Sequence, residues 1–269
     1  KEWIMEIKLV ATDMDGTFLD ENHEFDQDLF LKVLKKFQEK GIYFAAASGR
    51  ALLSLKTIFK EVQDQIIFIA ENGSVVEFHG EDVYEATMSP DFYQAMFAKL
   101  QECPYFDKNK CLLTGKRGSY VLKTVDPDYL AASQNYNEKI QKVSDFSEID
   151  DLVFKMTTNF DQEVLAEGEA WVTQNVEGVK AMTTGYECID IVLDYVDKGV
   201  AIQALMDQLG ISRDQVLAFG DNLNDLHMMQ VVGHAIAPEN ARPEILVLAE
   251  KVVGHHSTGS VLRYMEEEL

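Results

Sequence analysis

The sequence predicts an α/β protein with a Rossmann-like, doubly wound and mainly parallel sheet, interrupted by an inserted α+β domain. Two observations carry this prediction. Over residues 7–70, apolar strand-like runs alternate with helical patterns, which is the order of a parallel sheet covered by helices on both faces. The same alternation returns towards the end of the chain, after a middle stretch in which short alternating strands mix with helices. The middle is therefore expected to interrupt the core.

The first elements are predicted from apolar runs and the turn residues that end them. Residues 7–12 form a mostly apolar run closed by turn-forming residues 13–17, which is typical of a buried strand. Residues 26–40 show helical apolar spacing, and Gly41 is expected to end that helix. Two further strands are predicted at residues 42–47 and 66–70, with a helix at residues 51–60 between them.

The middle of the chain is predicted to be an α+β cap. Its helical patterns cover residues 91–100, 129–139 and 162–174. The parallel pattern then resumes with a helix at 198–209, a strand at 215–219 and more helix after Asn224. The expected boundaries are residues 5–83 for the first part of the core, 84–190 for the cap and 191–269 for the second part. Residues 1–4 precede Met5 and can be an expression remnant or a frayed terminus, so the predicted fold does not include them.

Composition excludes several classes of protein. The formal net charge of −22, from 24 basic and 46 acidic residues, argues against nucleic-acid binding, since phosphate backbones require a basic face. No apolar run is long enough to span a bilayer, and the start does not resemble a secretory signal. Cys103, Cys111 and Cys188 lack metal-ligand spacing and are expected to be reduced thiols. We therefore expect a cytoplasmic protein that binds neither nucleic acid nor membrane.

Polar residues follow three of the predicted core strands. Asp13 and Asp15 end the first, Ser48-Gly49-Arg50 follows the second, and residues 220–225 (Gly-Asp-Asn-Leu-Asn-Asp) follow the last. In an open parallel sheet the carboxyl ends of all strands lie on one edge, where ligands bind. Lys198 begins a helix after the apolar run 189–193, and it can reach this edge if that run belongs to the same region.

Each of these segments also has a simpler explanation. Asp13-Met14-Asp15-Gly16-Thr17 can be an acidic turn, because Asp side chains bond to nearby backbone. A calcium loop is excluded by its spacing, since Thr17 and Phe18 stand where a further ligand and a glycine are needed. Ser48 can simply cap a helix, and Lys198 can be a solvated helix residue. Four such segments on one edge are much less expected by coincidence, so together they predict a site.

The combined residues suit phosphoryl transfer. Asp13 can attack phosphorus and form an aspartyl-phosphate, and Asp15 can protonate the leaving alkoxide and then activate water. Mg²⁺ prefers oxygen ligands, and the carboxylates of Asp13 and Asp221 would supply them together with a backbone carbonyl. The groups expected to hold the phosphoryl oxygens are Ser48, Lys198 and the backbone amides near Met14 and Gly49.

The ordered set of motifs resembles the haloacid-dehalogenase-like hydrolases, specifically their Cof-type branch. The motifs are residues 13–17, Ser48-Gly49-Arg50, Lys198 within Val196-Asp197-Lys198-Gly199, and residues 220–225, with Glu71-Asn72-Gly73 as a further similar segment. The resemblance covers nearly all of the chain from Met5. It implies a Rossmann-like core with a cap inserted between the second and third motifs. It also implies Mg²⁺-dependent phosphatase activity on small phosphorylated metabolites, such as sugar phosphates.

The resemblance implies a role for each motif residue. Asp13 would be the nucleophile and Asp15 the acid/base, and the presence of Asp15 disfavours dehalogenation because relatives that cleave carbon–halogen bonds lack an acid there. The metal ligands would be Asp13, the carbonyl of Asp15, and Asp221. Contacts to phosphate are expected from Met14, Ser48, Gly49, Lys198 and Asn224. Supporting roles are expected for Thr17, Arg50, Asn222 and Asp225, with Asp225 orienting Lys198.

The motifs do not define the roles of three further groups of residues. The stretch Ala237-Pro238-Glu239-Asn240-Ala241 departs from the more usual Met-Gly-Asn-Ala sequence. His255-His256 is predicted to be a pair of loop histidines, because adjacent residues rarely bind one ion together. In the cap, the candidates for substrate contact are Tyr120, Lys123 and Lys155, for which surface positions are equally expected.

Three other functions share parts of this chemistry. A phosphomutase would return the phosphoryl group to a second hydroxyl of a sugar, and the core motifs do not distinguish it from a hydrolase. A non-catalytic sensor of a phosphorylated metabolite would need no acid/base pair such as Asp13 and Asp15. A receiver domain has no inserted cap, and its acidic pair precedes its phosphorylated Asp. The preferred prediction is a phosphoric monoester hydrolase acting on a small-molecule phosphate ester.

Overall fold

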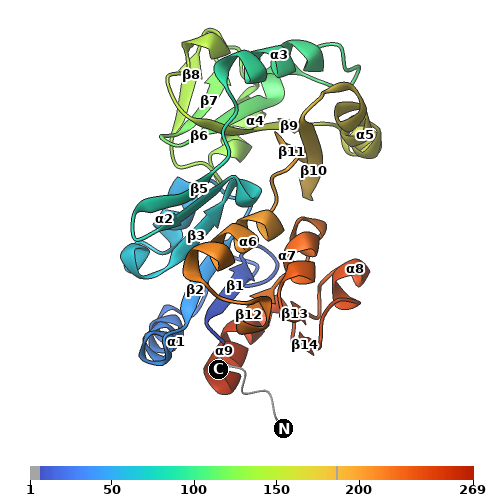
Figure 1. The fold of residues 1–269 in the computed structure, drawn as a ribbon. Coiled ribbons are helices and arrows are strands. Elements are labelled where there is room, and N and C mark those ends of the chain that lie inside the picture. The colour runs from blue at the N-terminus through green and yellow to red at the C-terminus, as the bar shows by residue number, and fades with distance from the viewer. Residues whose placement is uncertain (1–6, 186) are drawn as a thin grey trace. The chain divides into compact units, whose positions relative to one another are not determined.

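The computed structural model describes residues 7–185 and 187–269 (Figure 1). The chain forms two compact units. Among the described residues, the first holds residues 7–48, 60–84 and 197–269, and the second holds residues 49–59, 85–185 and 187–196. Residues 1–4, predicted to be a remnant or a frayed terminus, and Met5, the predicted start of the core, lie outside the described residues.

The first unit is built on an eight-stranded sheet with the order β14-β13-β12-β1-β2-β3-β4-β5. Its strands from β14 to β3 are parallel, and β4 pairs antiparallel with β3. This confirms the predicted Rossmann-like, mainly parallel sheet. The strands are β1 (Leu9–Asp13), β2 (Tyr43–Ala47), β3 (Ile67–Ala70), β4 (Val75–Phe78), β5 (Glu81–Glu85), β12 (Val216–Phe219), β13 (His234–Pro238) and β14 (Lys251–Val253).

Helices cover both faces of this sheet, as expected for a doubly wound fold. They are α1 (Gln27–Lys40), α6 (Lys198–Leu209), α7 (Leu226–Val231), α8 (Pro243–Leu246) and α9 (Ser260–Glu268). Residues of α6, α7 and α8 pack with Leu9, Ala45 and alternate residues of the other strands in one core cluster. On the opposite face, Phe30 of α1 packs against Phe44 with ring centroids 5.0 Å apart. These two apolar layers hold the central strands in place between them.

Helix α1 shows why the sequence prediction for this unit holds. The Asp26 side chain accepts a hydrogen bond from the Leu29 amide at 2.9 Å and caps the first turn. The apolar residues at helical spacing, among them Phe30 and Phe37, are buried, and the helix ends before Gly41. The helix predicted over residues 26–40 is therefore confirmed.

The second unit is an α+β domain with a six-stranded sheet of order β10-β11-β9-β6-β7-β8. Its pairings are antiparallel except for the parallel pair β7–β8. Its strands are β6 (Cys111–Gly115), β7 (Ser119–Leu122), β8 (Ile140–Val143), β9 (Val153–Asn159), β10 (Val179–Gly185) and β11 (Cys188–Leu193). Its helices are α2 (Leu52–Ile58), α3 (Pro90–Leu100), α4 (Pro127–Ser133) and α5 (Leu165–Asn175).

The helix predicted over residues 129–139 is too long. Helix α4 ends at Ser133, and the chain then turns into β8. The turn is stabilised by the Asn137 side chain, which donates to the Ser133 carbonyl at 3.0 Å and accepts from the Ser119 hydroxyl at 2.8 Å. The second of these bonds joins two separate segments of the sequence. The apolar spacing of residues 129–139 carries no information about such a contact.

The apolar run 189–193 also differs from its expected place. It lies in β11, which pairs with β9 and β10 in the six-stranded sheet and not with the parallel core sheet. Lys198 therefore owes its position to the first turn of α6 and not to a preceding core strand. The boundary predicted at residue 190 falls inside β11, and the three predicted domain ranges stay a prediction.

Candidate active site

The strand register brings the predicted motifs to one edge of the core sheet. Asp13 at the end of β1 is paired with Ala47, the last residue of β2. On the other side of β1, Thr12 is paired with Phe219, the last residue of β12. The residues that follow β2 and β12, Ser48 and Gly220, therefore begin on either side of Asp13, as expected for parallel strands.

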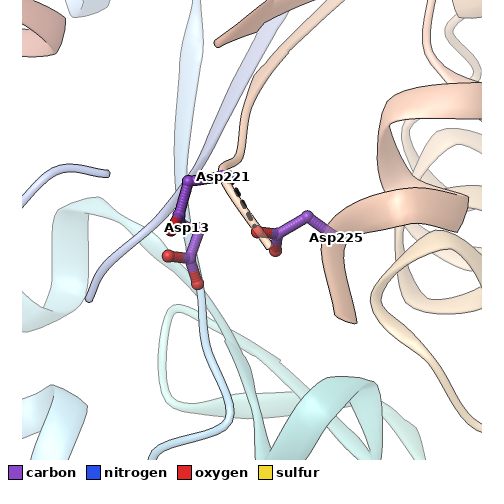
Figure 2. Close-up of side chains that lie close together, drawn as sticks. All are labelled: Asp13, Asp221 and Asp225. Carbon is purple, nitrogen blue, oxygen red and sulfur yellow. Dashed lines mark hydrogen bonds between the residues drawn. The ribbon is translucent and has the colours of Figure 1, made fainter. Parts of the chain in front are cut away.

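Three carboxylates from these segments lie close together. Asp13, Asp221 and Asp225 each offer an oxygen, and these oxygens all lie within 4.8 Å of one another (Figure 2). Asp13 is 5% exposed and Asp225 is fully buried. Like charges this close in a buried site are unfavourable unless cations or hydrogen-bond donors compensate them.

Lys198 compensates two of the three carboxylates. Its ammonium is fully buried and donates to Asp13 Oδ1 at 2.5 Å and to Asp225 Oδ1 at 2.6 Å. Burial alone would lower the pKa of Lys198, but the charges of Asp13 and Asp225 outweigh it and raise that pKa above its ordinary value. The amine therefore stays protonated and holds a fixed position beside Asp13.

Both carboxylate oxygens of Asp225 are engaged. Oδ2 accepts from the backbone amide of Asp221 at 3.0 Å (Figure 2). It also accepts from the amide of Asn222 at 3.1 Å, and Oδ1 accepts from Lys198. A carboxylate satisfied in this way orients its neighbours and has little capacity left for a metal. Asp225 lies between Lys198 and the amides of residues 221 and 222, and its supporting role stays a prediction.

The pKa values of the other two carboxylates indicate an excess of negative charge. Burial, followed by the charge of Asp225, raises the pKa of Asp13 well above its ordinary value, against the opposing effect of Lys198. The same two causes raise the pKa of Asp221 to about 6, although the Thr17 hydroxyl donates to its Oδ1 at 2.8 Å. Among these side chains, one ammonium faces three carboxylates, so a further cation would be favoured.

The acidic cluster fits a hard divalent cation. Carboxylate and carbonyl oxygens are the ligands that such ions prefer, and Asp13 and Asp221 present them from neighbouring loops. Gly16 lets the backbone pass close to this position, since it has φ 86° and a Cβ atom there would lie 2.6 Å from Asp221 Oδ2. The cluster could therefore hold a metal ion.

Asp15 lies outside this buried cluster. Its side chain is 40% exposed, and its Oδ1 lies 3.0 Å from Nδ1 of His23. The sequence offered no signal for the His23 contact, which depends on the turn between Asp15 and helix α1. The arrangement separates the two carboxylates of the first motif, because Asp13 is buried beside Lys198 while Asp15 is accessible.

The phosphate-binding residues predicted in the core unit lie around the same edge. The Met14 side chain is buried, and its carbonyl accepts from the amides of Phe18 and Leu19. Ser48 is buried after β2, and Asn224 donates from Nδ2 to Asn72 Oδ1 at 3.3 Å. Asn222 caps the following turn through a bond from the Leu223 amide to its Oδ1.

Two predicted motif residues and the cap candidates belong to the second unit. The Gly49 carbonyl accepts from the Lys155 ammonium at 2.6 Å, and Lys155 also pairs with the buried Asp190 at 3.0 Å. The Arg50 guanidinium lies 5.6 Å from the centre of the Tyr136 ring. Tyr120 donates to Asp151 and Lys123 donates to Ser144, so all three cap candidates have partners within the unit. Their contacts with substrate stay predictions.

The segment 237–241 holds the loop after β1, a role that sequence reasoning missed. Asn240 donates from Nδ2 to the Gly16 carbonyl at 2.7 Å and accepts from the His256 amide at 3.0 Å. His256 Nδ1 in turn lies 2.7 Å from the Leu19 carbonyl. The contacts of Asn240 with Gly16 and of His256 with Leu19 join residues more than two hundred positions apart, and the sequence carried no direct signal for them.

A model of the haloacid dehalogenase-like hydrolase family matches residues 10–265. The chain belongs to this family. The hydrolase is 29% identical to the 5-amino-6-(5-phospho-D-ribitylamino)uracil phosphatase YbjI of Escherichia coli strain K12, over 98% of this chain and 97% of that protein. It is 26% identical to an HMP-PP phosphatase of Cronobacter sakazakii, with 96% and 94% coverage. The crystal structure of SMU.1108c from Streptococcus mutans UA159 superposes with a TM-score of 0.89 at 25% identity, covering 97% and 98% of the two chains.

These comparisons confirm three predictions for the hydrolase. The resemblance to the Cof-type branch, the fold class and the assignment as a phosphoric monoester hydrolase all agree with the matched family and its relatives. Across residues 7–185 and 187–269, no helix has the length and apolar character needed to cross a membrane.

Proposed function

We propose that this hydrolase is a Mg²⁺-dependent phosphatase that acts on small phosphorylated metabolites through an aspartyl-phosphate on Asp13. The observation that carries the proposal is the buried Asp13 carboxylate, held by Lys198 beside Asp221 at the carboxyl edge of the sheet. The names of the relatives, a phosphatase of a ribitylaminouracil phosphate and an HMP-PP phosphatase, support a small organic phosphate as the substrate. A cytoplasmic location goes with such a substrate.

The residues that would hold Mg²⁺ are Asp13, Asp221 and the carbonyl of Asp15. When bound, the ion supplies positive charge that offsets the charge of the carboxylates and of the phosphoryl oxygens. Burial, followed by the charge of Asp225, raises the pKa values of Asp13 and Asp221, and a bound cation would lower both. Asp225 would not bind the ion, because its oxygens accept hydrogen bonds from Lys198 and the backbone amides.

The chain's own residues carry the two chemical steps. In the first, an oxygen of Asp13 attacks phosphorus, the bond from phosphorus to the leaving oxygen breaks, and Asp15 gives that oxygen a proton. In the second, Asp15 takes a proton from water, the water oxygen attacks phosphorus, and the bond to Asp13 breaks. Lys198, Ser48 and Asn224 would bind the phosphoryl oxygens, whose charge is stabilised most by donors fixed in advance.

The direct test is release of inorganic phosphate from a panel of phosphorylated metabolites, with sugar phosphates and 5-amino-6-(5-phospho-D-ribitylamino)uracil among them. We expect release that requires Mg²⁺, stops with a chelator and is lost in Asp13→Asn. Absence of turnover across the panel, together with tight binding of one member, would instead assign the protein to the metabolite sensors. A requirement for a sugar bisphosphate would favour a phosphomutase.

A further inference from the structure

The turn Glu71-Asn72-Gly73 after β3 has an unusual backbone. Its three residues have φ values of 52°, 56° and 99°, all in the left-handed region. Glu71 and Asn72 are each only 1% exposed. Non-glycine residues seldom adopt this conformation, and they keep it only where the surrounding structure holds them there. We therefore expect this buried turn to make specific contacts that hold the adjacent segments in position.

The turn touches three segments that carry predicted phosphate-binding residues. The Asn72 amide donates to the Ser48 carbonyl at 3.0 Å, and Asn72 Oδ1 accepts from Asn224 Nδ2 at 3.3 Å. Gly73 packs against the residue before Lys198, since a Cβ atom on it would lie 2.3 Å from the Asp197 carbonyl oxygen. One turn thus contacts the segments of Ser48, Asn224 and Lys198.

We infer that this turn positions the phosphate-binding groups, and that the Asn72 side chain sets the orientation of the Asn224 amide. The inference rests on the proposed function, in which Asn224 binds a phosphoryl oxygen. Asn72 is a positioning residue, because it acts through Ser48 and Asn224 and not on the reacting atoms themselves. Its amide N–H acts on Ser48 and its side-chain oxygen on Asn224, so the two effects can be separated by substitution.

The variant that separates them is Asn72→Gly. Glycine adopts a φ near 56° readily and keeps the N–H bond to Ser48, but it lacks the oxygen that accepts from Asn224. Loss of one such hydrogen bond is expected to raise the KM for p-nitrophenyl phosphate and the inhibition constant of inorganic phosphate about fivefold. We expect kcat and the melting temperature to change little. His79→Gly is the matched control, because His79 has φ 53° but is exposed and bonds to the Asp64 carbonyl.

A double-mutant cycle tests whether Asn72 acts through its partner. In an Asn224→Ala background, Asn72→Gly should have almost no further effect on KM or on phosphate inhibition. An unchanged KM and inhibition constant in Asn72→Gly, or an equal effect of Asn72→Gly in both backgrounds, would overturn the inference. If the wild-type enzyme has no activity, the proposed function fails. Calorimetric binding of inorganic phosphate with Mg²⁺ then still reports whether Asn72→Gly weakens the site.

Discussion

Replacing Lys198 by methionine should destabilise the metal-free protein strongly. The ammonium is fully buried and holds Asp13 at 2.5 Å and Asp225 at 2.6 Å, so its removal leaves two buried carboxylates without their cation. Removing one partner of a buried ion pair typically costs ~3–5 kcal/mol of unfolding free energy, and methionine fills a similar volume, which limits the loss of packing. We therefore expect Lys198→Met to lower the free energy of unfolding by ~3–5 kcal/mol near neutral pH.

The loss of unfolding free energy caused by Lys198→Met should become smaller as the pH falls. The pKa of Asp13 is already raised in the folded state by burial and by Asp225, and loss of the ammonium removes the main effect that lowers it. Between the unfolded and the folded pKa, the folded state binds more protons than the unfolded state, so stability falls as pH rises through this window. At acidic pH Asp13 can take up a proton, and the cost of losing Lys198 is then smaller.

The assay is urea unfolding followed by circular dichroism, without metal, near neutral and at mildly acidic pH. Lys32→Met is the matched control, because Lys32 makes an ion pair with Glu266 at 2.5 Å on the surface, where its side chain is 69% exposed. The control should lose little stability at either pH. If Lys198→Met loses no more than Lys32→Met, or if its deficit grows on acidification, the assigned role of the ammonium is wrong.

Three further predictions concern the carboxylates. Asp13→Asn should abolish turnover while leaving unfolding in urea unchanged or shifted to higher concentration, because it removes a buried charge whose pKa is raised; measurable kcat would refute the nucleophile assignment. Asp15→Asn should lower kcat/KM for an alkyl phosphate, which reports the phosphorylation step, by about 10²–10⁴-fold, but should lower kcat/KM for p-nitrophenyl phosphate much less, since that leaving group needs no proton; equal losses in kcat/KM would exclude general acid catalysis. Mg²⁺ affinity should fall by at least about tenfold per pH unit below the pKa of Asp221, about 6, because the ion must displace the proton of Asp221 and also that of Asp13, whose pKa is raised as well, and calorimetry at several pH values checks this.

The sequence predicted those parts of the site that follow from strand order. Asp13 and Ser48 come directly after a short apolar run and Asp221 comes one residue later, and parallel strands bring such residues to one edge whatever the details of packing. Lys198 could be predicted from its motif but not from its strand, since β11 belongs to the other sheet. The motif was informative because it reflects the chemistry, whereas the apolar run only indicated a strand.

Contacts between distant loops could not be predicted in the same way. Asn240 reaches the Gly16 carbonyl and Asn72 reaches Asn224 through side chains whose direction depends on the folded backbone. The left-handed φ of Glu71 is another example, because its conformation is imposed by burial and not by its own preference. The early end of α4 at Ser133 likewise depends on a bond from the distant Ser119 to Asn137.

The most direct test of the central claim is to look for the phosphoryl group on Asp13. In Asp15→Asn with p-nitrophenyl phosphate and Mg²⁺, the first step needs no acid but the second lacks its base, so the intermediate should accumulate. We predict that rapid acid quenching and peptide mass spectrometry will find one phosphoryl group on Asp13, absent when Asp13→Asn is added. Steady p-nitrophenol release without phosphorylation of Asp13, or phosphorylation at another residue, would contradict the account.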